Sequence, residues 1–294
     1  MTDAPLPDFD QLWDDATTPV DTEKQFQKLL LTVETLGDLP RALQVMTQIA
    51  RAQCLQRKLS AAHSTLDQVE RLMDSADTST RVRYLLERGR IFNVTKETNT
   101  AQPLFDQAWT LANDNNMEYE SVEAAAMLAT TADDPEDQLA WAEKALAIVE
   151  ASDDARTQSW LGTLYHSVGG AYYRMERYKR ALEHFEKSLT WREARRDPAA
   201  IRDSKWSLGR AMRRVGRIQD ALALQQSLAE QYISIGEESG YVQEELGECL
   251  LELGRAEKAR EHFANAYRLL STDADLVETE PDRLDRIKAL SGEA

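Results

Sequence analysis

Histidines, cysteines and carboxylates are the groups in this sequence that are able to bind metals or catalyse reactions. The histidines are His63, His166, His184 and His262. No two of them are four residues apart, the spacing that would place two imidazoles on one face of a helix around a metal. Cys54 and Cys249 also lack a partner at the spacing of a zinc or redox motif. The sequence therefore predicts no metal site, and we expect both cysteines to be buried packing residues.

The motifs of enzymes are equally hard to find. No Gly-rich phosphate loop or nucleophile elbow occurs in the sequence, and the Gly169–Gly170 pair stands inside a helical pattern where it favours close packing. Paired carboxylates are frequent, but in an acidic helical protein they usually form a solvated face. We therefore expect a protein that is not an enzyme and needs no cofactor.

The charge of the chain limits its partners. The formal net charge is −16, whereas a protein that binds nucleic acid through its phosphate backbone usually carries a basic excess. The sequence begins without the basic and apolar regions of a secretion signal, and no apolar run reaches the roughly 18 residues that a membrane span needs. We expect a cytoplasmic protein that binds neither nucleic acid nor membranes.

One segment reverses this charge balance. Between Arg174 and Arg217 there are 14 Lys and Arg against six Asp and Glu. Some of these cations, such as Arg192 and Arg195, stand near the predicted end of a helix, where they complement the helix dipole. A wholly structural role for the cluster stays open. The alternative is a binding surface for acidic groups.

A pattern of large and small side chains surrounds this segment. It consists of Tyr165, Val168, Gly169, Tyr172, Tyr178, Ala181, Phe185 and Ser188. The frame returns as Leu208, Gly209, Met212, Gly216, Ile218, Ala221 and Leu228, and again as Leu246, Gly247, Leu250, Gly254, Ala256, Ala259, Phe263 and Ala266. Weaker copies lie upstream. The pattern closely resembles the tetratricopeptide repeat, in which small residues allow two antiparallel helices to cross closely and large residues fill the adjoining gaps.

The resemblance implies an all-α fold, a right-handed α-solenoid of antiparallel helix pairs with terminal capping helices, that is, a tetratricopeptide-like superhelix. The frame recurs about every 40 residues, so we expect a long variant of the repeat, whose usual length is about 34 residues. Gly216 and Gly254 stand where the first helix of a pair must end, which predicts a left-handed backbone there. We expect a single solenoid over 22–294, with pairs at 41–75, 78–114, 117–151, 156–195, 198–237 and 239–271 and capping helices at 22–36 and 282–290.

The first 21 residues differ from the rest. They contain six acidic side chains, no basic ones and three prolines, a composition typical of a mobile segment. Phe9, Leu12 and Trp13 either form a short docking motif or are incidental apolar residues. The composition favours the second interpretation.

Candidate binding residues follow from the resemblance, because certain places of each first helix face the concave groove in this family. In the fifth repeat these places hold Trp206, Arg210 and Arg213, and their expected neighbours in the fourth include His166 and Tyr173. A second candidate set consists of Arg83, Arg90 and Asn93. The sixth repeat instead offers an acidic wall made of Glu244, Glu248 and Glu252 beside Tyr241. Arginine and aromatic side chains in a concavity suit a peptide that carries carboxylates.

The resemblance thus implies a protein-interaction scaffold or adaptor that binds an extended or helical, acidic peptide segment of another protein. The alternative is a ligand- or peptide-sensing regulatory module. Such a module would be autoinhibited if the acidic start or the stretch Asp273–Glu280 occupied the groove. Oligomeric state stays open.

Overall fold

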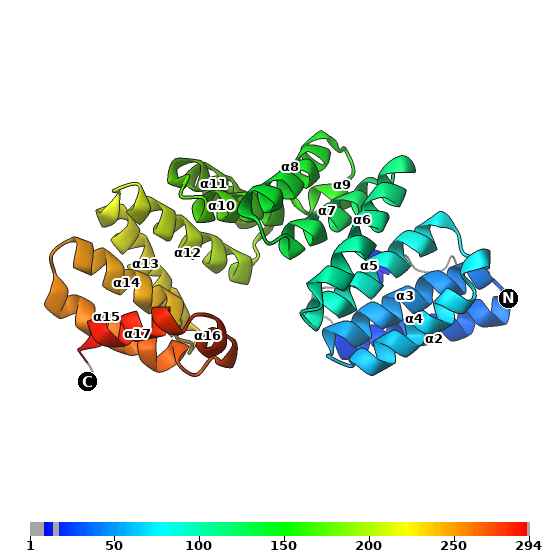
Figure 1. Ribbon diagram of the computed structural model, residues 1–294, viewed down its shortest axis with the longest axis horizontal. Coiled ribbons are helices and arrows are strands. Elements are labelled where there is room, and N and C mark those ends of the chain that lie inside the picture. Colours follow the sequence, from blue (N-terminus) through cyan, green and yellow to red (C-terminus); the bar gives the residue numbers. More distant parts are fainter. Residues whose placement is uncertain (1–8, 14–17, 293–294) are drawn as a thin grey trace. The chain divides into compact units, whose positions relative to one another are not determined.

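The computed structural model describes residues 9–13 and 18–292, and all regular elements among them are helices (Figure 1). Consecutive helices pack against each other along the chain, as antiparallel neighbours joined by short turns. The predicted all-α fold of helix pairs is therefore confirmed. The chain divides into two compact units, an N-terminal unit of residues Met1–Trp160 and a C-terminal unit of residues Leu161–Ala294.

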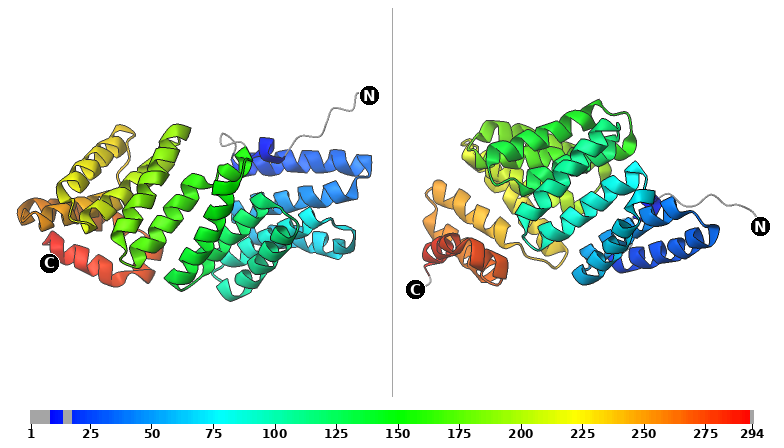
Figure 2. Two further views of the ribbon diagram at one scale, coloured as in Figure 1. Left: turned by 90° about the horizontal axis from the view of Figure 1, so that it is seen from above. Right: turned by 45° about the vertical axis from the view of Figure 1, so that its right-hand side comes forward.

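The described residues of the N-terminal unit form seven long helices and three shorter elements (Figures 1 and 2). Its helices are α1 (Phe9–Leu12), α2 (Pro19–Leu36), α3 (Leu39–Leu55), α4 (Leu59–Arg71), the 3₁₀ turn η1 (Met73–Ser75), α5 (Thr78–Val94), α6 (Thr98–Asp114), α7 (Glu118–Thr131), α8 (Pro135–Ala151) and α9 (Ala155–Gln158).

The C-terminal unit continues the same alternation. Its helices are α10 (Leu161–Arg174), α11 (Tyr178–Arg195), α12 (Pro198–Arg214), α13 (Ile218–Ser234), α14 (Gly240–Glu252), α15 (Ala256–Leu270), α16 (Ala274–Thr279) and α17 (Pro281–Ser291). The short helix α16 lies in the acidic stretch that follows the last pair, and its Leu276 is buried in the same apolar core as Leu270.

Local chemistry explains where many of the helices begin and end. The side chains of Asp77 and Asp197 each accept a hydrogen bond from a backbone N–H in the first turn of the helix that follows. Proline at the first helical position adds a pre-set φ angle in α12 and other helices. Gly216 and Gly254 have φ angles of 85° and 72°, as predicted from their place between two helices of a pair.

Close crossing of paired helices depends on glycine facing a ring. A Cβ atom added to Gly169 of α10 would lie 2.7 Å from Cδ1 of Phe185 on α11, and Gly89 and Gly247 face the rings of Phe105 and Phe263 in the same way. All three phenylalanines are buried. The predicted pairing of small and large residues therefore forms the core of each of these pairs.

Two aromatic rings of the acidic start pack on the rest of the unit. Phe9 is buried and packs with Phe26 of α2, and Trp13 contacts the same ring. The composition of residues 1–21 gives no sign of these contacts, and the mobility of the segment stays a prediction. For residues 1–8 and 14–17 that prediction lies outside the described part of the chain.

Adjacent glycines of α10 provide a matched test of this packing. Gly169→Ala is expected to lower the free energy of unfolding by about 1–2 kcal/mol, because overpacking against Phe185 outweighs the better helix propensity of alanine. Gly170→Ala is expected to raise it by about 0.5–1 kcal/mol, because the new Cβ meets only Arg174 Nη1 at 3.6 Å. Urea titrations of both variants measure the difference, and equal effects would contradict this account of the crossing.

Candidate functional site

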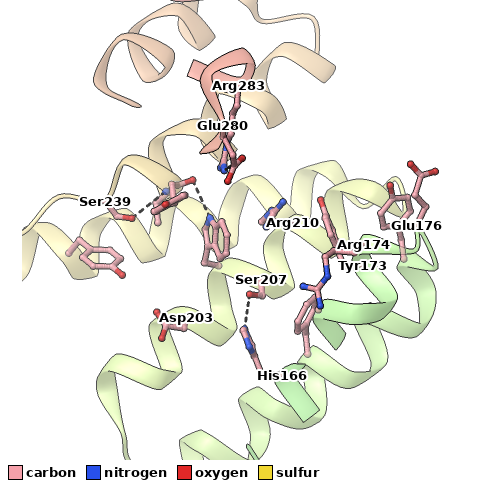
Figure 3. Close-up of a pocket in the computed structure, with 17 residues that line it drawn as sticks. His166, Tyr173, Arg174, Glu176, Asp203, Ser207, Arg210, Ser239, Glu280 and Arg283 are labelled. Carbon is pink, nitrogen blue, oxygen red and sulfur yellow. Dashed lines mark hydrogen bonds and ion pairs between the residues drawn. The ribbon is translucent and has the colours of Figure 1, made fainter. Parts of the chain in front are cut away.

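A cavity of about 900 Å³ lies in the C-terminal unit (Figure 3). Helices α10, α12 and α14 and the start of α17 supply most of its wall. The wall is rich in aromatic rings, namely Tyr173, Tyr178, Phe185, Trp206, Tyr232 and Tyr241. The wall also carries six charged side chains, and the size of the cavity suits a ligand of a few amino-acid residues.

Arg210 of α12 is a charged side chain of this cavity that two aromatic rings contact. Its guanidinium carbon lies 4.6 Å from the ring centroid of Tyr173 and 4.5 Å from that of Trp206. Its Nε lies 3.3 Å from Oε1 of Glu245, and its side chain is 30% exposed. Two ring contacts and one ion pair therefore fix the guanidinium while it stays accessible from the cavity.

Trp206 is itself held in place by the next repeat. Its indole N–H donates a hydrogen bond of 3.1 Å to the backbone oxygen of Tyr241, and the two rings meet edge to face with centroids 5.5 Å apart. Tyr173 reaches the cavity from α10, so two helices, α10 and α12, bring together the predicted residues Trp206, Arg210 and Tyr173.

Arg213, by contrast, does not line this cavity. Its side chain is 9% exposed, and its guanidinium donates to Glu245 at 2.9 and 3.1 Å and to Glu252 at 2.7 Å. Burial alone would lower the pKa of Arg213, but the hydrogen bonds and negative charge of Glu245 raise it above its ordinary value. Arg213 thus joins α12 to α14, and its charge is already neutralised.

The predicted acidic wall is also neutralised. Arg283 of α17 donates to Glu244 through Nε at 3.0 Å, and Arg286 donates to Glu248 at 3.1 Å. Glu252, the third member, pairs with Arg213. The groove therefore lacks the separate basic and acidic halves that the sequence predicts, because each glutamate of α14 faces an arginine of a neighbouring helix.

His166 lies on the side of the cavity that is away from Glu280 and Arg283 (Figure 3). It is half-buried, its Nε2 is 2.9 Å from Oγ of Ser207 and its ring packs 5.4 Å from that of Phe185 (Figure 3). Burial, helped by the positive charge of Arg192, lowers the pKa of His166 to about 4. At neutral pH it is an uncharged hydrogen-bonding group of the cavity wall.

The second candidate set lies in the N-terminal unit. Arg83 of α5 pairs with Glu120 of α7 at 3.0 Å, and Arg90 pairs with Glu123 and with Glu87, the latter at 3.3 Å. Asn93 is half-buried one turn further along α5. These arginines are therefore occupied by carboxylates of the chain itself.

Sequence reasoning missed the glutamate partners, although a signal for them exists. The pairs Arg83–Glu120, Arg213–Glu252 and Glu248–Arg286 are separated by 37, 39 and 38 residues. Each separation is close to the length of one repeat. Oppositely charged residues that are one repeat apart in the sequence can therefore be expected to meet on neighbouring helices.

Metal and thiol chemistry has little support in the described residues. No group of three or more His, Cys, Asp or Glu among them is placed to hold a metal ion. Cys54 and Cys249 are buried and unbonded, as expected for packing residues, and burial raises the pKa of Cys249 to about 12. None of the helices in the described chain is long and apolar enough to cross a membrane.

Comparisons with known proteins agree with this fold. A family model described as tetratricopeptide repeat matches residues 160–234. No curated protein matches the chain. Among solved structures, the chain resembles the apo form of RapI with a TM-score of 0.72 and 14% identity over 97% of this chain and 81% of that one.

Two further structures share the fold. A signal-transduction ATPase with numerous domains and a tetratricopeptide repeat sensor, from Pyrococcus horikoshii, matches with a TM-score of 0.69 and 15% identity over 94% of this chain and 42% of that one. NprR in complex with its cognate peptide NprX matches with a TM-score of 0.55 and 14% identity over 96% of this chain and 81% of that one.

The depressed pKa of His166 makes stability depend on pH. In the unfolded chain its pKa is about 6.5, so the folded protein resists protonation, and the stability present above pH 6.5 is lost as pH falls toward 4. Between pH 7 and 4.5 we expect the free energy of unfolding to fall by about 2 kcal/mol more in the wild type than in His166→Gln. Urea titrations at both pH values measure this, and parallel losses would contradict a buried, neutral His166.

The ion pairs of Arg213 are expected to be structural. Arg213→Met should lower the free energy of unfolding by about 3 kcal/mol, because it leaves Glu245 buried with fewer partners. Adding Glu245→Gln should recover at least half of that loss. Chemical denaturation of the two single variants and the double variant tests this. If the free energy of unfolding of the double variant is lowered by the sum of the two single-variant losses, the two side chains are not coupled.

Proposed function

Because the chain is a tetratricopeptide-repeat protein, we propose that it is a non-catalytic interaction module that binds a peptide segment of another protein in the cavity of its C-terminal unit. One observation carries the proposal. Arg210 is held between the rings of Trp206 and Tyr173 with its guanidinium accessible from an aromatic cavity.

The chemistry of that arrangement favours a peptide that carries a carboxylate. An arginine in a partly desolvated place forms charge-assisted hydrogen bonds to carboxylates, and the flanking rings supply apolar area for a neighbouring side chain. The charged side chains of the wall balance when Arg210 is counted, with Arg174, Arg210 and Arg283 against Glu176, Asp203 and Glu280. The acidic character of the ligand therefore depends on Arg210 and not on a basic groove.

The comparisons support a peptide-binding role in general, without indicating the kind of peptide. NprR was solved with its cognate peptide, which shows that a structure of similar fold accommodates a peptide. The absence of enzyme motifs and the pairing of the other arginines agree with a binding role.

A sensing role is the second candidate, and one observation favours it. Glu280, which ends the acidic stretch Asp273–Glu280, lines the same cavity and pairs with Arg283 at 3.0 Å. The chain's own carboxylate therefore stands near the place proposed for a ligand carboxylate. In this version of the proposal a peptide competes with the C-terminal segment, and binding changes how α16 and α17 pack.

Selection of peptides from a random display library provides the test. We expect the wild type to enrich peptides that contain Asp or Glu next to an aromatic residue, with affinities that weaken as salt rises. Arg210→Glu should weaken their binding at least tenfold, a loss of about 1.4 kcal/mol or more. The matched control is Lys179→Glu, which makes the same charge change at an exposed place on α11 outside the cavity wall.

The outcomes separate the two candidates. If Glu280→Ala raises the affinity for the selected peptides while Lys179→Glu leaves it unchanged, the C-terminal segment competes for the cavity and the sensing version holds. If affinity is unchanged in Glu280→Ala and lost in Arg210→Glu, the scaffold version holds. If the selected peptides bind the Arg210→Glu variant with the same affinity as the wild type, the binding site lies outside the cavity.

A further inference from the structure

The packing of α1 onto the N-terminal unit has features of a docked peptide motif. α1 is a single turn of four residues, Phe9–Leu12, and it lies against the long helices of its unit. Phe9 is only 4% exposed, and its ring lies 5.7 Å from that of Phe26 in an edge-to-face arrangement. The ring centroid of Trp13 also lies 5.7 Å from that of Phe26. Two aromatic side chains four residues apart thus anchor the segment.

Arginines of two other helices surround these rings. The guanidinium carbon of Arg41 on α3 lies 4.0 Å from the centroid of Phe9, and that of Arg83 on α5 lies 5.7 Å from it. Arg51 of α3 lies 5.1 Å from the ring of Trp13. These distances are in the range of favourable cation–π contacts, so the surface combines an apolar floor with a rim of guanidinium groups, of which those of Arg51 and Arg83 also pair with carboxylates of the chain.

A specific hydrogen bond adds to the fit. The indole N–H of Trp13 donates to Oε1 of Gln48 at 2.8 Å, and Gln48 is itself buried. The surface therefore satisfies the one polar group of the tryptophan, as binding sites for tryptophan anchors do. Hydrophobic burial alone would not require a buried glutamine at that place.

The composition of the segment indicates what such a surface selects. The first 21 residues carry six acidic and no basic side chains, and the guanidinium groups of Arg41, Arg51 and Arg83 line the surface, although Arg83 also pairs with Glu120. Trp13 also covers Arg51, which pairs with Glu123 at 2.9 Å and with Glu87 at 3.8 Å. Release of the segment would expose one side of this ion-pair network to solvent.

We propose that the surface formed by α2, α3 and α5 is a docking site for acidic peptide segments with two aromatic side chains four residues apart. The chain's own residues Phe9–Trp13 occupy this site and act as an internal competitor. A partner protein that carries a segment of the same chemistry binds by displacing them. The site lies in the N-terminal unit and is independent of the cavity around Arg210.

Fluorescence anisotropy with a labelled peptide of residues 4–17 tests this on the full-length chain. The variant Phe9→Ala/Trp13→Ala leaves the docking surface empty and is expected to bind the peptide saturably. The wild type should bind it at least tenfold more weakly, because a tethered segment competes at an effective concentration of about 1 mM or more. A peptide that carries the same two alanine substitutions should not bind either protein.

Charge-reversal variants identify the surface. In the Phe9→Ala/Trp13→Ala background, Arg41→Glu should abolish binding, whereas Lys28→Glu, at an exposed place on α2, should leave it unchanged. Arg210→Glu should also leave it unchanged, so that failure of this proposal and failure of the cavity proposal are distinguishable. Absence of peptide binding to the emptied variant with unchanged helix content, or equal binding to the wild type, would overturn the proposal.

Limited proteolysis gives a second measurement that does not need the emptied variant. Chymotrypsin cleaves after aromatic residues, so the docked Phe9 and Trp13 should be protected in the wild type. Arg41→Glu should increase the rate of cleavage at these residues at least fivefold relative to Lys28→Glu, by destabilising the docked state. Equal rates in both variants would show that the arginine rim does not hold the segment.

Discussion

Pairing of arginine with glutamate between successive first helices is the interaction on which much of this structure depends. Arg213 of α12 reaches Glu245 of α14, Arg283 of α17 reaches Glu244 of α14, and Arg90 of α5 reaches Glu123 of α7. Most of these carboxylates are buried, and a buried charge without a partner is costly. Within each unit, the helices therefore pack in the register that pairs these charges.

This network decides which cations remain for a ligand. The sequence offers many arginines along the presumed groove, but Arg83, Arg90 and Arg213 are neutralised by glutamates of a neighbouring helix. Arg210 also has a glutamate neighbour, Glu245, but two aromatic rings contact its guanidinium and its side chain stays partly exposed to the cavity. A small number of accessible charges in an aromatic cavity gives more specificity than a uniformly basic groove would, since each contact is geometrically defined.

Contact between guanidinium groups and aromatic rings recurs in both units. In the C-terminal unit Arg210 lies beside Trp206 and Tyr173, and in the N-terminal unit Arg41 lies over Phe9. In the first case the chain supplies the rings and leaves the cation accessible to a ligand. In the second, the long helices supply the cations and a short segment of the same chain supplies the ring. One kind of interaction thus accounts for both proposed binding surfaces.

The sequence by itself determined the helical repeat, because glycine opposite phenylalanine and glycine between helices are requirements of local geometry that recur at a fixed spacing. Gly169 with Phe185, and the left-handed Gly216, stand as the pattern predicts. It also placed Trp206, Arg210, Tyr173 and His166 around one cavity.

Only the tertiary structure decided that Arg213 is buried in ion pairs and that Phe9 packs on the helices. The physical reason is that pairing and burial depend on side chains from other helices, 32 residues away for Arg213 and Glu245, whereas helix formation and close crossing depend on residues within one pair.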